Sequence, residues 1–200
     1  MADVQVPLLP THYYHIYNHA VGNELFFVND ADYQDMLAKL ELYVLPVCHI
    51  LSYCLMPNHF HFVIQVKSST EISQAIIDRI GPDRFFRKAE ADEYFISRQV
   101  SRHFANLFSS YAKHYNFLRD RTGTIFKRAF RRSEINDMEY FKAVIFYVHQ
   151  NPVEGGIVSS MKKWEYSSYK ILLSNSPTYI AREETLDLFG GLKNFNAYHS

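Results

Sequence analysis

The stretch CLMPNHFHFVI, residues 54–64, decides the fold, because it places a turn signal between two apolar segments. Pro57 and Asn58 are the turn residues. The residues after them alternate as in a strand with one buried face, so His59 and His61 share one face and the apolar residues share the other: Phe60, Phe62 and Ile64. This pattern predicts a β-hairpin with strands over 47–56 and 59–66 in the middle of a sheet.

The patterns on either side of the hairpin complete an α+β order. Periodicity predicts a strand over 12–20, a helix over 31–45 that begins at Asp30 or Asp32, and then, after the hairpin, helices over 70–80, 98–119, 138–149 and 166–173. A basic strand within 121–135 follows a glycine turn, residues 83–99 are mixed and charged and form an excursion, and NPVEGG forms a turn. We predict a ferredoxin-like antiparallel sheet with helices packed on one face, plus a C-terminal helical extension.

The composition is that of a globular protein. Of the 200 residues, 48% are hydrophobic and 16% are aromatic, which excludes a disordered chain. No apolar run approaches the roughly 18 residues of a membrane-spanning helix, and the first residues lack a signal-peptide pattern. Cys48 and Cys54 are the only cysteines, which favours a reduced, cytoplasmic protein.

The charge distribution is more informative than the net charge, which is zero. Between Lys113 and Arg132 the chain carries seven lysines and arginines against one acid, Asp120. A solvated face and a nucleic-acid-binding face both explain such a block.

The two histidines of the hairpin have two interpretations. On a strand, their Cα atoms lie about 6–7 Å apart on one face, a spacing at which two imidazoles can chelate one divalent ion. Alternatively, both are hydrogen-bonded polar residues on a solvated face. A catalytic metal needs a further ligand, and the helix over 98–119 is the expected source.

The same helix carries two tyrosines one turn apart, Tyr111 and Tyr115. Both can belong to the apolar stripe of the helix, with their hydroxyl groups bonded to a partner. One of them can instead attack a phosphodiester as a nucleophile, provided that a metal or a base offsets its pKa of about 10.

These features resemble a known family. The segments YHIYNHAVGNELFF (14–27), MPNHFHFVI (56–64), FSSYAKHYNFLRDRTGTIFKRAFRR (108–132), YVHQNPVEGGIV (147–158) and WEYSSYKILL (164–173) occur in the order of the corresponding family motifs. The chain resembles the HUH single-tyrosine transposases, specifically the IS200-like or REP-associated tyrosine transposases. It departs from them at His19, where the family usually has arginine.

The resemblance implies a metal-dependent transposase that cleaves and rejoins single-stranded or hairpin DNA through a 5′-phosphotyrosine. His59 and His61 would ligate Mg²⁺ or Mn²⁺. Many relatives have the third ligand, a Gln or His, one turn after the tyrosine, where this chain has Tyr115 instead, so we expect His114, on nearly the same side of the helix, to replace it. Tyr111 would be the nucleophile, because it stands five residues before Asn116, and Tyr115 is the alternative. A basic group would contact DNA phosphates: Lys127, Arg128, Arg131 and Arg132.

The resemblance also implies an organisation: a catalytic domain over 1–152 and an extension over 153–200 packed on it, acting as a monomer or a homodimer. A second hypothesis is a domesticated protein that binds hairpin DNA without cleaving it. A third is a metal-dependent hydrolase of small phosphoesters, which would need neither the tyrosine hydroxyl nor a DNA hairpin.

Overall fold

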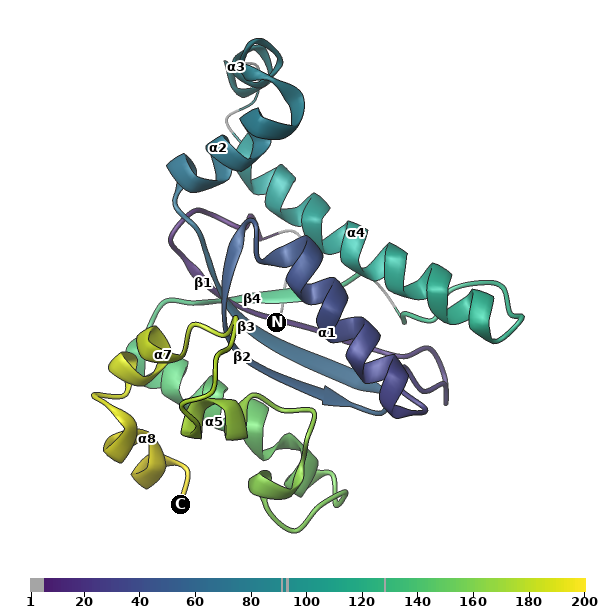
Figure 1. Cartoon of the computed structure of the whole chain (residues 1–200), viewed down its shortest axis with the longest axis vertical. Helices are drawn as coiled ribbons and strands as arrows, with labels where there is room; N and C mark the ends of the chain where they lie inside the picture. Colours follow the sequence, from purple (N-terminus) through teal and green to yellow (C-terminus); the bar gives the residue numbers. More distant parts are fainter. Residues whose placement is uncertain (1–5, 91, 93, 128) are drawn as a thin grey trace.

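The protein is built on a four-stranded antiparallel sheet, as the computed structural model of residues 6–90, 92, 94–127 and 129–200 shows (Figure 1). The strand order is β2-β3-β1-β4, with β1 Tyr13–His19, β2 Cys48–Met56, β3 His59–Val66 and β4 Arg131–Ile135. The predicted hairpin is β2 and β3, joined by Pro57 and Asn58. The predicted α+β class, with an antiparallel sheet and C-terminal helices, is confirmed.

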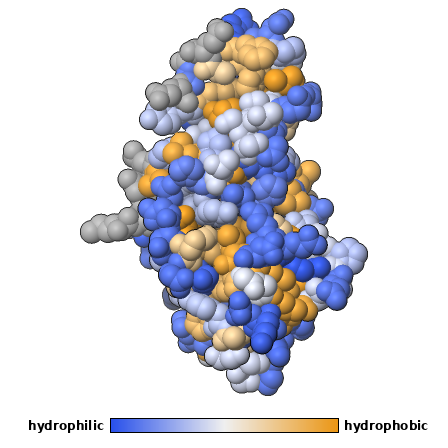
Figure 2. All heavy atoms as spheres, turned by 90° about the vertical axis from the view of Figure 1, so that its left-hand side faces the viewer, coloured by the Kyte–Doolittle hydropathy of each residue, from blue (hydrophilic) through white to orange (hydrophobic). Residues whose placement is uncertain are grey.

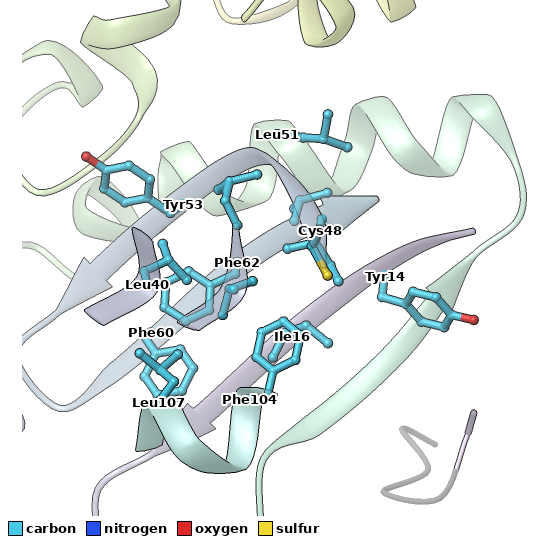
Figure 3. Packing of buried hydrophobic residues seen from close by; sticks show 14 of the residues in the cluster. Tyr14, Ile16, Leu40, Cys48, Leu51, Tyr53, Phe60, Phe62, Phe104 and Leu107 are labelled. Atoms are coloured by element: carbon cyan, nitrogen blue, oxygen red, sulfur yellow. The ribbon is translucent and has the colours of Figure 1, made fainter. Parts of the chain in front are cut away.

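One face of the sheet packs on two helices, α1 Asp30–Val44 and α4 Phe95–Leu118. We call it the phenylalanine face, because alternate residues of β3 place Phe60 and Phe62 there. Phe60 stacks on Phe108 of α4 at a ring-centroid distance of 5.1 Å. Figure 3 shows this core, which also includes Ile16, Leu40, Phe104 and Leu107.

The other face carries the histidines and is covered by α5 Met138–Glu154 (Figure 1). We call it the histidine face. The segment after α5 returns to the far edge of β2 through η1 Met161–Lys163, α6 Tyr169–Leu173, α7 Arg182–Leu188 and α8 Leu192–Tyr198. The Leu55 amide donates to the Tyr166 carbonyl, and the Thr185 hydroxyl donates to the Leu51 carbonyl, so this segment is bonded to β2 at several points.

Two further helices project beyond the sheet, α2 Ser69–Ile80 and α3 Pro82–Glu90. They pack on the first turns of α4, around buried Phe85 and Phe95. Figure 2 shows hydrophobic residues gathered at this end of the molecule, where Phe86 is exposed. The segment predicted as an excursion, residues 83–99, is largely helical, because Phe85 and Phe95 give it a small core of its own.

Two boundaries predicted from the sequence are corrected. The N-cap of α1 is Asn29, whose side chain accepts from the Asp32 amide while the Asp32 carboxylate accepts from the Asn29 amide. The predicted turn at NPVEGG begins only at Gly155, because Asn151 and Pro152 belong to the last turns of α5. That helix begins where predicted, at Met138, and its N-cap is Asp137, whose side chain accepts from the Tyr140 amide.

No helix in the described part of the chain is long and apolar enough to cross a membrane.

Candidate active site

Four histidines meet on the histidine face because β1 and β3 are antiparallel neighbours. His19 lies opposite His59 in the register, and their rings stack at 4.8 Å between centroids. His15 lies diagonally opposite His61, with 5.0 Å between ring centroids. The predicted pair itself, His59 and His61, has perpendicular rings 5.3 Å apart. The strand alternation read from the sequence therefore places both histidines on one face.

His61 has one nitrogen engaged and one free. Its Nδ1 lies 2.8 Å from Nε2 of His15. Its Nε2 is buried and has no hydrogen-bond partner among the described residues. Buried polar atoms in native proteins are paired with protein groups, water or ions, so this nitrogen is available to a further group.

His59 lies at the edge of the same site and contacts α5. Its Nε2 is 3.0 Å from Oδ1 of Asn151, and its Nδ1 is 2.8 Å from Oδ1 of Asn58. The Asn151 amide nitrogen donates to the Tyr147 carbonyl, which turns the Asn151 oxygen toward His59. The helix thus presents an oxygen ligand beside the imidazole pair.

Besides Tyr17 of β1, whose ring lies 6.0 Å from that of His61, the fold brings Tyr147 of α5 to the histidines. Its ring lies 5.4 Å from that of His61 in an edge arrangement, and its side chain is 41% exposed. It stands four residues before Asn151 on α5, so the two side chains share one face of the helix. A phenol at this position is accessible from solvent and adjacent to His61, one of the two predicted ligands.

The electrostatics keep the imidazoles neutral. Burial lowers the pKa of His59 and places that of His61 well below its ordinary value. Neutral imidazoles have the lone pair that a metal needs. Two imidazole nitrogens and an amide oxygen form a mixed donor set that suits Mn²⁺ and, with water and phosphate oxygens, Mg²⁺. Within the described ranges, no group of three or more His, Cys, Asp or Glu side chains is arranged around a metal position.

The predicted nucleophile, Tyr111, lies on the opposite side of the sheet. Its side chain is 1% exposed, and its hydroxyl donates to the Phe26 carbonyl at 2.5 Å. Burial raises its pKa, and the nearby carboxylates of Asp32 and Asp35 raise it further. Tyr111 is therefore a core residue, and the prediction that it acts with His59 and His61 is incompatible with this arrangement.

The alternative nucleophile and the predicted third ligand also lie on α4, away from the histidine face. The Tyr115 hydroxyl donates to the Leu25 carbonyl at 2.7 Å, and the Arg119 guanidinium stacks over its ring. His114 is exposed and lies 3.0 Å from an Asp35 carboxylate oxygen on α1. The structure brings neither residue to the histidine pair.

The predicted basic group divides between the two faces. Lys127 and Arg131 line a pocket of about 270 Å³ beside the histidines, together with Tyr17, Asn18 and His19. Arg132, the next residue of β4, points to the other face, where it donates to the Ser101 hydroxyl of α4. Arg128 lies outside the described residues.

Sequence reasoning missed Tyr147, Asn151 and the role of α5. The signal was present, since YVHQNP places a tyrosine and an asparagine at helical i, i+4 spacing. In the sequence, this motif served only as part of the family resemblance and as the end of a helix followed by a turn, and it predicted no role in the site for these residues. The fold brings them to β3 because α5 crosses the histidine face.

The comparisons with known proteins concern the fold. No family model matches the sequence, and no curated protein matches it. Among solved structures, the chain is similar to a REP-associated tyrosine transposase bound to a REP hairpin, with a TM-score of 0.58 and 12% sequence identity. The match covers 88% of this chain and 89% of that chain. At this identity, the similarity shows a shared fold over most of both chains.

Proposed function

We propose that the protein is a metal-dependent DNA strand transferase of the tyrosine transposase kind, acting on single-stranded or hairpin DNA, with Tyr147 as the nucleophile. The observation that carries the proposal is the convergence of Tyr147 and Asn151 from α5 with His59 and His61 from β3. The fold relative, a tyrosine transposase bound to a REP hairpin, supports the substrate class.

The donor set fits a divalent metal. His61 Nε2, His59 Nε2 and Asn151 Oδ1 would hold Mg²⁺ or Mn²⁺, and the unpartnered His61 nitrogen is the observation that supports this fit. The bound ion would polarise the scissile phosphate and offset the charge on its non-bridging oxygens.

The chain's own groups account for the covalent step. The Tyr147 oxygen attacks phosphorus and forms the O–P bond as the bond from phosphorus to the 3′-oxygen breaks. The phenol proton passes to water, and the departing 3′-oxygen takes a proton from water. The products are a 5′-phosphotyrosine and a free 3′-hydroxyl, which can reverse the step without another energy source. The exposure of Tyr147 leaves room for a DNA strand at this position.

The basic pocket would bind the DNA backbone next to the reacting phosphate. Lys127 and Arg131 line it, and His19, which stacks on His59, joins it to the histidine pair. Cations at this distance from the site would hold a neighbouring phosphate of the same strand and fix its register.

The decisive experiment is an adduct assay with a matched pair of tyrosine variants. The protein is incubated with end-labelled single-stranded hairpin oligonucleotides and either Mn²⁺ or EDTA, and the products are separated in SDS. We expect an SDS-resistant protein–DNA band that requires Mn²⁺, that persists in Tyr111→Phe and that is absent in Tyr147→Phe. An adduct that survives in Tyr147→Phe and disappears in Tyr111→Phe would overturn the assignment.

Metal binding can be tested separately from cleavage. We expect His59→Ala, His61→Ala and Asn151→Ala each to weaken Mn²⁺ binding, measured by electron paramagnetic resonance of free Mn²⁺. His114→Ala, on the outer side of α4, is the matched histidine control and should bind Mn²⁺ as the wild type does. Unchanged Mn²⁺ affinity in the His59→Ala and His61→Ala variants would exclude this site.

One observation favours a second candidate, a hairpin-binding protein without cleavage. The described residues supply no carboxylate and no third imidazole to the metal position. Such a protein would bind the hairpin tightly, with Lys127 and Arg131 in contact, and would form no adduct with either metal. The homodimer suggested by the sequence stays a prediction, which light scattering of the purified protein would test.

A further inference from the structure

The histidine pair has a third histidine behind it, which the proposed chemistry does not use. His15 is buried on β1, and its Nε2 lies 2.8 Å from Nδ1 of His61. The two rings are inclined by only 27°, so an N–H of one ring lies close to the plane that holds the lone pair of the other. Nε2 of His15 is thus occupied by His61 and does not face the metal position.

We propose that His15 is a positioning residue: it accepts the Nδ1–H of His61 and thereby fixes His61 in the tautomer whose Nε2 lone pair faces the site. This inference rests on the proposed function for its purpose, but its structural content concerns the metal-free protein. It concerns the position of the proton between the two rings and not the metal.

The argument begins with the number of protons in the contact. Two ring nitrogens that face each other at hydrogen-bond distance share one proton, so one ring donates and the other accepts. If His15 donated, His61 would carry its own proton at Nε2. That nitrogen is buried with no partner in the part of the chain that the structure describes, and a buried N–H without an acceptor is among the rarest arrangements in native proteins.

A hydrogen bond donated by His61 to His15 leaves no unpaired N–H at Nε2 of His61. With the proton on Nδ1 of His61, its Nε2 has a lone pair and no hydrogen, which is the state that a metal ligand requires. Ligating histidines in general donate their second ring N–H to a neighbouring acceptor, which sets both the tautomer and the ring orientation. Here the acceptor is another imidazole, supplied by the adjacent strand.

The surroundings hold His15 in place. The Tyr17 ring stacks on the His15 ring at 4.9 Å between centroids, and the Tyr147 ring meets it edge-on at 6.2 Å. The contact between His15 and His61 is diagonal across β1 and β3, so the sheet register itself sets the distance between the rings. A ring at position 15 that cannot accept a hydrogen bond would leave the His61 proton without this partner.

The primary experiment reads the tautomer directly, with neither metal nor DNA. Long-range ¹H–¹⁵N correlation spectra of the metal-free, histidine-labelled protein at about pH 8, where these buried imidazoles are neutral, distinguish the two forms of each ring. We expect His61 to be protonated at Nδ1 in the wild type. Protonation of His61 at Nε2 would overturn the inference.

The variants separate positioning from packing. His15→Phe keeps a ring but removes the acceptor, and we expect loss of the Nδ1–H form of His61 and a fall in Mn²⁺ affinity of roughly 10- to 100-fold. His15→Gln keeps an acceptor oxygen and should retain the tautomer and most of the affinity. Tyr13→Phe, on the same strand and face, is the matched control and should change neither. If His15→Phe folds, as shown by circular dichroism, and keeps both the tautomer and the affinity, the inference is wrong.

The two proposals fail in different ways. A wild-type protein with His61 protonated at Nδ1 but without Mn²⁺ binding or adduct would support the positioning role and overturn the proposed function. If His15→Phe does not fold, the wild-type tautomer and the His15→Gln variant still decide the matter.

Discussion

The two faces of the sheet use the same strands for opposite purposes. On the phenylalanine face, β3 contributes Phe60 and Phe62 to a core closed by α1 and α4. On the histidine face, the alternate residues of the same strand are His59 and His61, and α5 adds Tyr147 beside them. Neighbouring residues of β3 point to opposite faces. The residues that stabilise the fold therefore alternate along the strand with those proposed to act on DNA.

The comparison explains which tyrosine suits each role. Tyr111 and Tyr147 both lie on long helices that cross the sheet, but on opposite faces. Tyr111 is enclosed by aromatic rings and bonded to a carbonyl, whereas Tyr147 is 41% exposed beside His61. A tyrosine on an apolar helix stripe belongs to whichever face its helix covers, and only the packing of the helices decides that face.

The largest contrast should appear in stability. Phe60→Ala removes a fully buried ring that packs against Phe62 and Phe108, and should lower the free energy of unfolding by about 3–5 kcal/mol. Tyr147→Phe, on the other face, removes only the hydroxyl of a partly exposed residue and should change the free energy of unfolding by less than about 0.5 kcal/mol. Urea unfolding followed by far-UV circular dichroism measures both. Equal losses would mean that the two faces do not differ in this way.

The second contrast concerns the dependence of stability on pH. Buried imidazoles lie on the side of the sheet covered by α5, and their protonation is coupled to unfolding. His149 is fully buried, and its Nδ1 lies 3.0 Å from Nε2 of His199. The other nitrogen of His199 donates to the Phe195 carbonyl, so His149 is the donor between the two rings. Its Nε2 then accepts from the Ser168 hydroxyl at 3.0 Å.

Burial lowers the pKa of His199 from its ordinary value of 6.5 to about 4. Below about pH 6.5, this residue therefore binds a proton more readily in the unfolded protein than in the folded protein. The stability that this residue contributes is fully present above about pH 6.5 and is lost as the pH falls toward 4. The loss from this one group amounts to about 3 kcal/mol. We expect His199→Gln to flatten the dependence of unfolding free energy on pH in this window, measured by urea unfolding from about pH 7 to pH 4.5. An unchanged slope in the variant would show that His199 is not held neutral.

Much of the fold and part of the site followed from the sequence. The hairpin and the placement of His59 and His61 on one face were predictable, because strand alternation is a local property. The assignment of Tyr111 and His114 to that face was wrong, because the side of the sheet on which α4 packs depends on long-range contacts. Asn151 was missed for a related reason: a proline after it indicated a turn, although the helix continues to Glu154. The predicted domain boundary after residue 152 stays a prediction.

A smaller contrast divides two neighbours on β4. Arg131 lines the basic pocket on the histidine face, whereas Arg132 bonds to Ser101 on the phenylalanine face. We expect Arg131→Ala to weaken hairpin binding about tenfold and to reduce the slope of log K against log salt by about one. Arg132→Ala should leave the salt slope as in the wild type. Fluorescence anisotropy with a labelled hairpin over a salt series tests both, and equal slopes for the two variants would place the DNA elsewhere.

The smallest expected effect concerns Tyr111, the residue that the sequence predicted as the nucleophile. Tyr111→Phe removes the hydrogen bond to the Phe26 carbonyl and keeps the ring in its contact with Phe27. A neutral buried hydrogen bond contributes about 1 kcal/mol, so we expect that loss in urea unfolding and no loss of metal-dependent adduct. The raised pKa of this phenol gives the same expectation, because it opposes the ionisation that a nucleophile needs. A Tyr111→Phe variant that unfolds as the wild type does but forms no adduct would contradict the choice of Tyr147 as nucleophile, since among the described residues no contact joins Tyr111 to the histidines.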